Sequence, residues 1–121
     1  MINITMNSKR LKLTVTGHAL PEESPMHKEI CAAASALAQS MMYSISRYND
    51  GEGTMKSTEY RDQPGDLMIR IWPETWAERE IRHIFNIYAD GLELLAESHP
   101  YSVTFIRDGE LITAKEENGH E

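Results

Sequence analysis

The segment GHALPEESPMHKEICAAASALAQS, residues 17–40, contains two residue types that can do covalent chemistry together. Cys31 is the only cysteine of the chain, and His18 precedes it across a short polar segment. A thiolate attacks a carbonyl carbon, and an imidazole can take the thiol proton and return it to a leaving amine. The residue types alone also allow a small buried cysteine and a surface histidine that do no chemistry.

The elements around these two residues determine whether they can meet. Apolar residues alternate with polar ones over residues 2–6 and 11–15, which predicts an antiparallel β-hairpin with one face in solvent. His18 continues this alternation on the polar side, at the end of the second strand. Residues 19–28 hold two prolines and predict an exposed loop, and residues 28–48 are rich in helix-forming Ala, Leu, Met and Gln.

The start of this helix decides what surrounds the thiol. An ordinary cysteine thiol has a pKa of about 8.5, so it is mostly protonated at neutral pH unless a helix N-terminus or an imidazolium favours the thiolate. A helix that begins near His27 or Lys28 places Cys31 close to its N-terminus. If Ser24 is the N-cap instead, Cys31 lies in the second turn, where the helix dipole acts weakly. The sequence leaves both starts open.

A second hairpin follows the first helix, which should end at residues 49–51, where Asn-Asp-Gly favours a helix stop. A mostly polar stretch covers residues 54–61, and apolar residues alternate over residues 67–71. Pro64 and Gly65 lie between the two stretches, in the order typical of the centre of a type II turn. This half of the chain therefore predicts two strands joined by a tight turn.

A long amphipathic helix is the clearest element of the sequence. Thr75 and Glu78 have the spacing of a capping box, and Pro100 marks the region where the helix should end. Apolar residues recur between these points at helical spacing: Ile81, Ile84, Phe85, Tyr88, Leu92 and Leu95. A last strand is expected around residues 103–105, before a turn at Asp108-Gly109.

The order of these elements predicts an α+β fold, with a mostly antiparallel sheet and two helices packed on one face in the order β-β-α-β-β-α-β. We expect a single domain over residues 1–114 and a frayed tail over residues 115–121, which are acidic and almost without apolar side chains. Trp72 and Trp76 should pack under the second helix, or else form an aromatic patch for a peptide or a second subunit.

Composition limits the class of protein. The chain has 121 residues, a net charge of -7 and a sequence pI near 5.2, so general attraction to nucleic acid is not expected. A single cysteine and an N-terminus without the pattern of a secretory signal favour the cytoplasm. No apolar run approaches the roughly 20 residues that span a bilayer, so no contact with a membrane is expected.

Three blocks of the sequence, VTGHA, ICAAASALAQS and YADGLELLAESHPYSVTF, resemble the Prp family of ribosomal-processing cysteine proteases. The resemblance runs from Leu11 to about Phe105, with the blocks in the family's order. It implies a homodimeric protease without a cofactor that removes a short N-terminal extension from a bacterial large-subunit ribosomal protein. It also implies that Cys31 is the nucleophile and His18 the general base.

Two further residues are candidates for supporting roles. Ser35 lies four residues after Cys31 and so on the same helix face, where its hydroxyl could bond near the thiolate or only to its own backbone. Glu29 lies just before the cysteine and could orient a neighbour, or it could be a solvated carboxylate in the first helical turn.

Two alternative functions stay open at this point. The loop before Cys31 lacks the glycines and the aspartate that family members carry, so the chain could be a non-catalytic dimeric protein of the same fold that binds a ribosomal protein or peptide. His27 and Cys31 are also spaced i, i+4, and His18 could join them as a third zinc ligand. We expect no metal, because the sequence offers no evident fourth protein ligand.

Overall fold

The computed structural model describes residues 1–48 and 52–113, so the predicted helix stop at residues 49–51 and the tail at 115–121 lie outside the described residues. The strands are β1 (Ile2–Asn7), β2 (Lys12–Gly17), β3 (Met55–Gln63), β4 (Asp66–Pro73), β5 (Val103–Arg107) and β6 (Glu110–Ile112). The helices are α1 (His27–Arg47), the short 3₁₀ helix η2 (Thr75–Ala77) and α2 (Glu78–Ser98). Neither long helix of this described part is apolar enough over its length to span a membrane.

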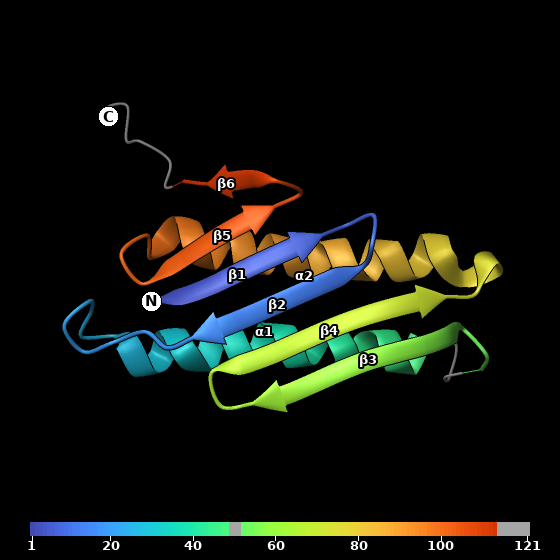
Figure 1. Cartoon of the computed structure of the whole chain (residues 1–121), viewed down its shortest axis with the longest axis horizontal. Helices are drawn as coiled ribbons and strands as arrows, with labels where there is room; N and C mark the ends of the chain where they lie inside the picture. Colours follow the sequence, from blue (N-terminus) through green and yellow to red (C-terminus); the bar gives the residue numbers. More distant parts are fainter. Residues whose placement is uncertain (49–51, 114–121) are drawn as a thin grey trace.

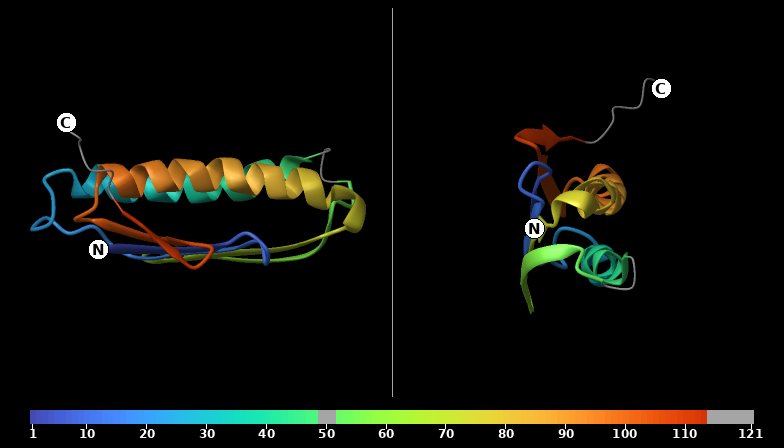
Figure 2. Two further views of the ribbon diagram at one scale, coloured as in Figure 1. Left: turned by 90° about the horizontal axis from the view of Figure 1, so that it is seen from above. Right: turned by 90° about the vertical axis from the view of Figure 1, so that its right-hand side faces the viewer.

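The strands form one six-stranded sheet in the order β3-β4-β2-β1-β5-β6. Neighbouring strands are antiparallel except β1 and β5, which are parallel. β1 and β4 run in the same direction, because both are antiparallel to β2. After β4, helix α2 carries the chain back along the sheet, so β5 runs in the same direction as β4 and β1. Both α1 and α2 lie on the same face of the sheet (Figure 2). The predicted α+β fold with a mostly antiparallel sheet and two helices on one face is confirmed.

The core lies between the sheet and the two helices, and the spacing of apolar residues explains it. Alternate residues of β1, such as Ile2, Ile4 and Met6, are buried while their neighbours face outward. The helices contribute the residues at spacings of three and four: Ile30, Ala34, Ala38, Met41 and Ile45 from α1, and Ile81, Phe85, Ala89, Leu92 and Ala96 from α2. The apolar stripe predicted for α2 therefore faces the sheet.

The pairing of β2 with β4 brings distant parts of the chain to one end of the molecule. Thr16 is opposite Asp66 in the register, and the N–H of Gly17 donates to the carbonyl of Gly65 at 2.9 Å. The φ angle of Gly65 is +71°, as the third residue of the predicted type II turn requires. As a result, the end of β2, the start of α1 and the β3–β4 turn lie near one another (Figure 1).

The predicted capping box is wrong. Thr75 is the first residue of η2, its N-cap is Glu74, and α2 begins only at Glu78 with Ala77 as N-cap. Neither N-cap makes a side-chain hydrogen bond to the helix. The chain enters α2 through a turn of 3₁₀ helix, so Thr75 and Glu78 do not have the positions that a reciprocal cap needs.

Two other features of the sheet differ from the sequence-based expectation. A sixth strand, β6, follows the predicted turn at Asp108 and Gly109 and pairs with β5. Trp72 and Trp76 do not pack under α2, since 37% and 57% of their surfaces are exposed. Alternation along β4 explains Trp72, because it buries Ile71 and turns the next side chain to the open face, where the Arg70 guanidinium lies 4.5 Å from the ring.

The buried face of α2 generates a prediction about stability. Phe85 is fully buried, so replacing it with alanine leaves a cavity, and we expect Phe85→Ala to lower the free energy of unfolding by about 3–5 kcal/mol. Ile87, on the same helix, is 52% exposed, so Ile87→Ala serves as the control and should change it by less than about 1 kcal/mol. Urea denaturation measures both. Equal losses in the two variants would contradict the assigned faces of α2.

Candidate active site

Cys31 lies one turn after the start of α1, at the end of the helix that meets the loop from β2. The helix begins at His27, with Met26 as N-cap, so the later of the two starts that the sequence allowed is the one observed. Cys31 is half-buried, and its Sγ accepts a hydrogen bond from the N–H of Ala19 at 3.3 Å. Sγ also lies 3.9 Å from the carbonyl oxygen of Ala19, to which the thiol can donate, so the N–H and the carbonyl of Ala19 both hold the sulfur in place.

His18 follows directly after the end of β2, and its imidazole is exposed. Its ring lies against Gly65 of the β3–β4 turn, where a Cβ atom would come within 2.5 Å of the imidazole Nε2. Gly65 therefore meets two requirements at once, a positive φ angle for the turn and an open surface for the histidine ring.

A cleft of about 390 Å³ contains both candidate residues. His18 lines it from the end of β2, and Cys31 and Ser35 line it from one face of α1. Residues 62–67, at the tip of the β3–β4 hairpin, form part of its lining. The end of β2, one face of α1 and the distant β3–β4 turn thus surround one open cavity with a thiol and an imidazole in its wall.

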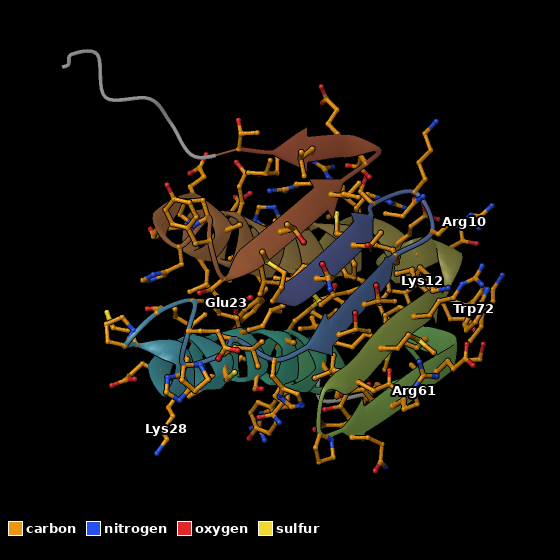
Figure 3. All side chains as sticks on the ribbon, turned by 60° about the vertical axis from the view of Figure 1, so that its left-hand side comes forward. Arg10, Lys12, Glu23, Lys28, Arg61 and Trp72 are labelled. Atoms are coloured by element: carbon orange, nitrogen blue, oxygen red, sulfur yellow. The ribbon has the colours of Figure 1, made fainter. Side chains whose placement is uncertain are left out.

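The loop between His18 and α1 is fixed at several points. The amino group of Met1 donates to the carbonyl of His18 at 2.5 Å and forms an ion pair with Glu23 at 2.9 Å. The other carboxylate oxygen of Glu23 accepts from the N–H of Leu20 at 2.9 Å. Glu23 lies on this loop, close to the start of α1 (Figure 3). The contacts tie the loop to the N-terminal strand on the side where His18 and Ala19 leave β2.

These contacts shift the acidity of Glu23. The Met1 ammonium, which donates to the carboxylate, lowers the pKa of Glu23 below its usual value of 4.5, and the Leu20 N–H lowers it further. Ionised Glu23 therefore favours the loop arrangement in which its contacts to Met1 and Leu20 form.

The other candidate residues differ in position. Ser35 lines the cleft beside Cys31, whereas Glu29 is exposed and is not among the cleft residues. The Nδ1 atom of His27 lies 3.2 Å from the carbonyl of Ser24, outside the cleft lining. Within residues 1–48 and 52–113, no three His, Cys, Asp or Glu side chains are grouped to hold a metal ion, so the zinc alternative has no ligand set there.

Two parts of the site were not anticipated from the sequence. The Ala19 N–H donor was not expected, because the residue type of a backbone donor carries no signal of its role. The contact between His18 and Gly65 was also missed, although the sequence had already indicated the turn around Gly65. The strand order that places β4 beside β2 was the missing information.

The sequence matches a family model described as "Cysteine protease Prp" over residues 1–120. A search of curated proteins finds no match.

Several solved structures share the fold. Two are structures of an essential ribosomal processing protease Prp from S. aureus. The first, with a covalently linked product peptide, has 20% identity and a TM-score of 0.64 and covers 88% of this chain and 99% of its own. The second, with a substrate peptide, has 17% identity and a TM-score of 0.64, and the match covers 88% of this chain and 96% of the S. aureus chain. SMU.848 from Streptococcus mutans has 20% identity and a TM-score of 0.61, covering 93% and 92%.

The contact between His18 and Gly65 generates a prediction. In Gly65→Ala the new methyl group displaces the imidazole, so we expect kcat/KM for peptide cleavage to fall about tenfold or more. The matched control is Gly109→Ala, because Gly109 also has a positive φ, +84°, but no atom within 4 Å of an added Cβ. Steady-state kinetics of both variants, with their folding checked by circular dichroism, make the comparison. Equal activity in the two variants would show that the ring contact does not matter.

The Glu23 contacts generate a prediction about pH. Because its pKa is lowered in the folded state, Glu23 contributes stability above about pH 4.5, and this contribution is lost as the pH falls through the lowered pKa. We expect the wild-type protein to have a higher Tm than Glu23→Gln at neutral pH, and the difference to shrink in acid. Thermal unfolding of both proteins across this range is the measurement.

The neighbouring Glu22 provides the control for this experiment. It is exposed, so Glu22→Gln removes the same charge without removing the contacts to Met1 and Leu20. A Tm difference for Glu23→Gln that stays constant in acid, or that Glu22→Gln reproduces, would contradict the role of the ion pair.

Proposed function

The chain belongs to the cysteine protease Prp family, and we propose that it is an endopeptidase that removes a short N-terminal extension from a bacterial large-subunit ribosomal protein. Cys31 is the nucleophile and His18 the general base of this proposal. The observation that carries it is their shared cleft, in which the Ala19 N–H points at the Cys31 sulfur. The solved S. aureus protease with a bound substrate peptide supports a peptide as the ligand of such a cleft.

The proposed reaction is acyl transfer in two steps. His18 takes the thiol proton, and the Cys31 sulfur attacks the scissile carbonyl carbon to form a C–S bond. The imidazolium then gives its proton to the leaving amine as the C–N bond breaks, which leaves a thioester on Cys31. A water molecule, deprotonated by His18, attacks the thioester, and the C–S bond breaks to release the acid and restore the thiol.

The cleft offers groups for the supporting roles. The Ala19 N–H, at 3.3 Å from Sγ, stabilises negative charge on sulfur before the attack. The Ser35 hydroxyl, one turn further along α1, is available to bond the thiolate or the substrate backbone. Glu29 does not line the cleft, so in this proposal it touches neither the thiol nor the substrate. Its carboxylate stabilises the start of α1, because a negative charge is favourable in the first turn of a helix.

The proposal predicts which side chains cleavage requires. We expect Cys31→Ala and His18→Ala each to lower the cleavage rate by about a thousandfold or more, because each removes an indispensable group. The matched control for the histidine is His83→Ala, which removes a histidine of α2 outside this cleft. N-terminal peptides of ribosomal proteins serve as substrates, and mass spectrometry identifies the products.

The same experiment separates this function from its alternatives. If the folded wild-type protein binds these peptides and cuts none of them, the non-catalytic binding protein of the same fold is the better account. If cleavage survives in Cys31→Ala, the nucleophile is another residue.

A homodimer and a cytoplasmic location are also parts of the proposal, and both rest on the family resemblance and the composition. Light scattering on the purified protein tests the first, since a dimer has twice the 13.8 kDa mass of one chain.

A further inference from the structure

The hairpin wall of the cleft carries two carboxylates whose charges are balanced differently. Asp66 is bound by the guanidinium of Arg61 through two hydrogen bonds, of 2.9 and 3.2 Å, on opposite oxygens. This contact raises the pKa of Arg61, so the guanidinium stays protonated, and the positive charge of Arg61 balances the negative charge of Asp66. Arg61 projects from β3 in Figure 3. Because Arg61 already supplies its counter-charge, Asp66 attracts a cationic substrate side chain only weakly.

Asp62, by contrast, has no cationic partner among the ion pairs of the described residues. Its Oδ2 accepts hydrogen bonds from the Gln39 amide at 3.1 Å and the Tyr60 hydroxyl at 3.2 Å, and both donors are neutral. The pKa of Tyr60 is raised, mainly by burial and also by its hydrogen bond to Asp62, so the hydroxyl remains protonated and can donate. The two donors hold the carboxylate in place at the cleft without balancing its charge.

The position of Gln39 relates Asp62 to the nucleophile. Cys31, Ser35 and Gln39 are spaced four residues apart and lie along one face of α1. Eight residues of helix correspond to about 12 Å, the length of three to four residues of an extended peptide. The charge of Asp62 thus lies along the same face as Cys31, within reach of a peptide whose scissile bond is at the sulfur.

We propose that Asp62 selects substrates with a lysine or arginine three to four residues from the scissile bond. The inference rests on the proposed protease function and names a specificity residue of that cleft. A cationic side chain supplies the counter-charge that the fold does not provide, whereas an acidic side chain at that position meets repulsion.

The test compares cleavage of paired peptides that differ at one position, with either lysine or its uncharged analogue norleucine there. The pair is made for each position on both sides of the scissile bond. We expect the wild-type protein to prefer lysine by about threefold to tenfold at a position three or four residues away, and Asp62→Asn to lose this preference. Asp62→Lys should reverse it, so that the norleucine peptide is cut faster than the lysine peptide, and added salt should weaken the wild-type preference.

Glu59→Gln is the matched control, because Glu59 lies on the same strand, β3, outside the cleft lining. It removes the same charge from the hairpin and should keep the lysine preference. An equal rate for lysine and norleucine peptides at every position, or a preference that Asp62→Asn retains or Glu59→Gln also abolishes, would overturn the role of Asp62.

A binding measurement keeps this test independent of catalysis. Fluorescence anisotropy of the labelled lysine and norleucine peptides with Cys31→Ala, with and without Asp62→Asn, reports recognition alone. A lysine preference in binding that depends on Asp62, without any cleavage by the wild-type protein, would support the Asp62 role and reject the protease function. Cleavage without any such preference would reject the Asp62 role and leave the protease function standing.

Discussion

The hydrogen bond from the Ala19 N–H to the Cys31 sulfur is the contact on which the proposed site depends. Ala19 directly follows His18, so this bond ties the end of β2 to α1 where the thiol emerges. The contacts of Met1 and Glu23 hold the loop in place, and this bond adds the direct link between the residue after His18 and the thiol itself. The buried position of Ala19, 4% exposed, anchors the junction to the core of the protein.

The sheet supplies the second constraint on the site. Since β4 pairs with β2, the β3–β4 turn lies beside His18, and Gly65 offers a surface without a side chain for the imidazole. The same hairpin places Asp62 on the cleft and connects it to α1 through Gln39. The β3–β4 hairpin therefore has two roles. Gly65 in its turn contacts the His18 ring, and Asp62 at the end of β3 presents a negative charge to the substrate.

Local patterns in the sequence were enough to predict most of the elements. Period-two alternation identified β1, β2 and β4, and the apolar spacing identified α2, because each signal depends only on near neighbours. The same alternation that buried Ile69 and Ile71 could also have placed Trp72 on the open face. β6 was missed because Glu110–Ile112 is short and mostly exposed. The Thr75 pattern failed because a capping sequence does not prevent a 3₁₀ turn.

The candidate site was predictable only in its residue types. Cys31 and His18 were identified from their chemistry and from the motifs around them, whereas the cleft depends on the pairing of β2 with β4, between residues about fifty positions apart in the chain. Such long-range pairing leaves no local pattern in a single sequence. For the same reason Asp62 could not be singled out, since Gln39, which bonds it, comes from α1, 23 residues away in the chain.

The most direct test of the central claim is the detection of a covalent acyl intermediate during turnover. Rapid acid quenching of the protein with a cleavable peptide, followed by peptide mapping in a mass spectrometer, identifies the modified residue. The account predicts the N-terminal product peptide attached to Cys31 through a thioester that hydroxylamine releases. An intermediate on another residue, or active turnover with no adduct on Cys31 under conditions that preserve thioesters, would contradict it.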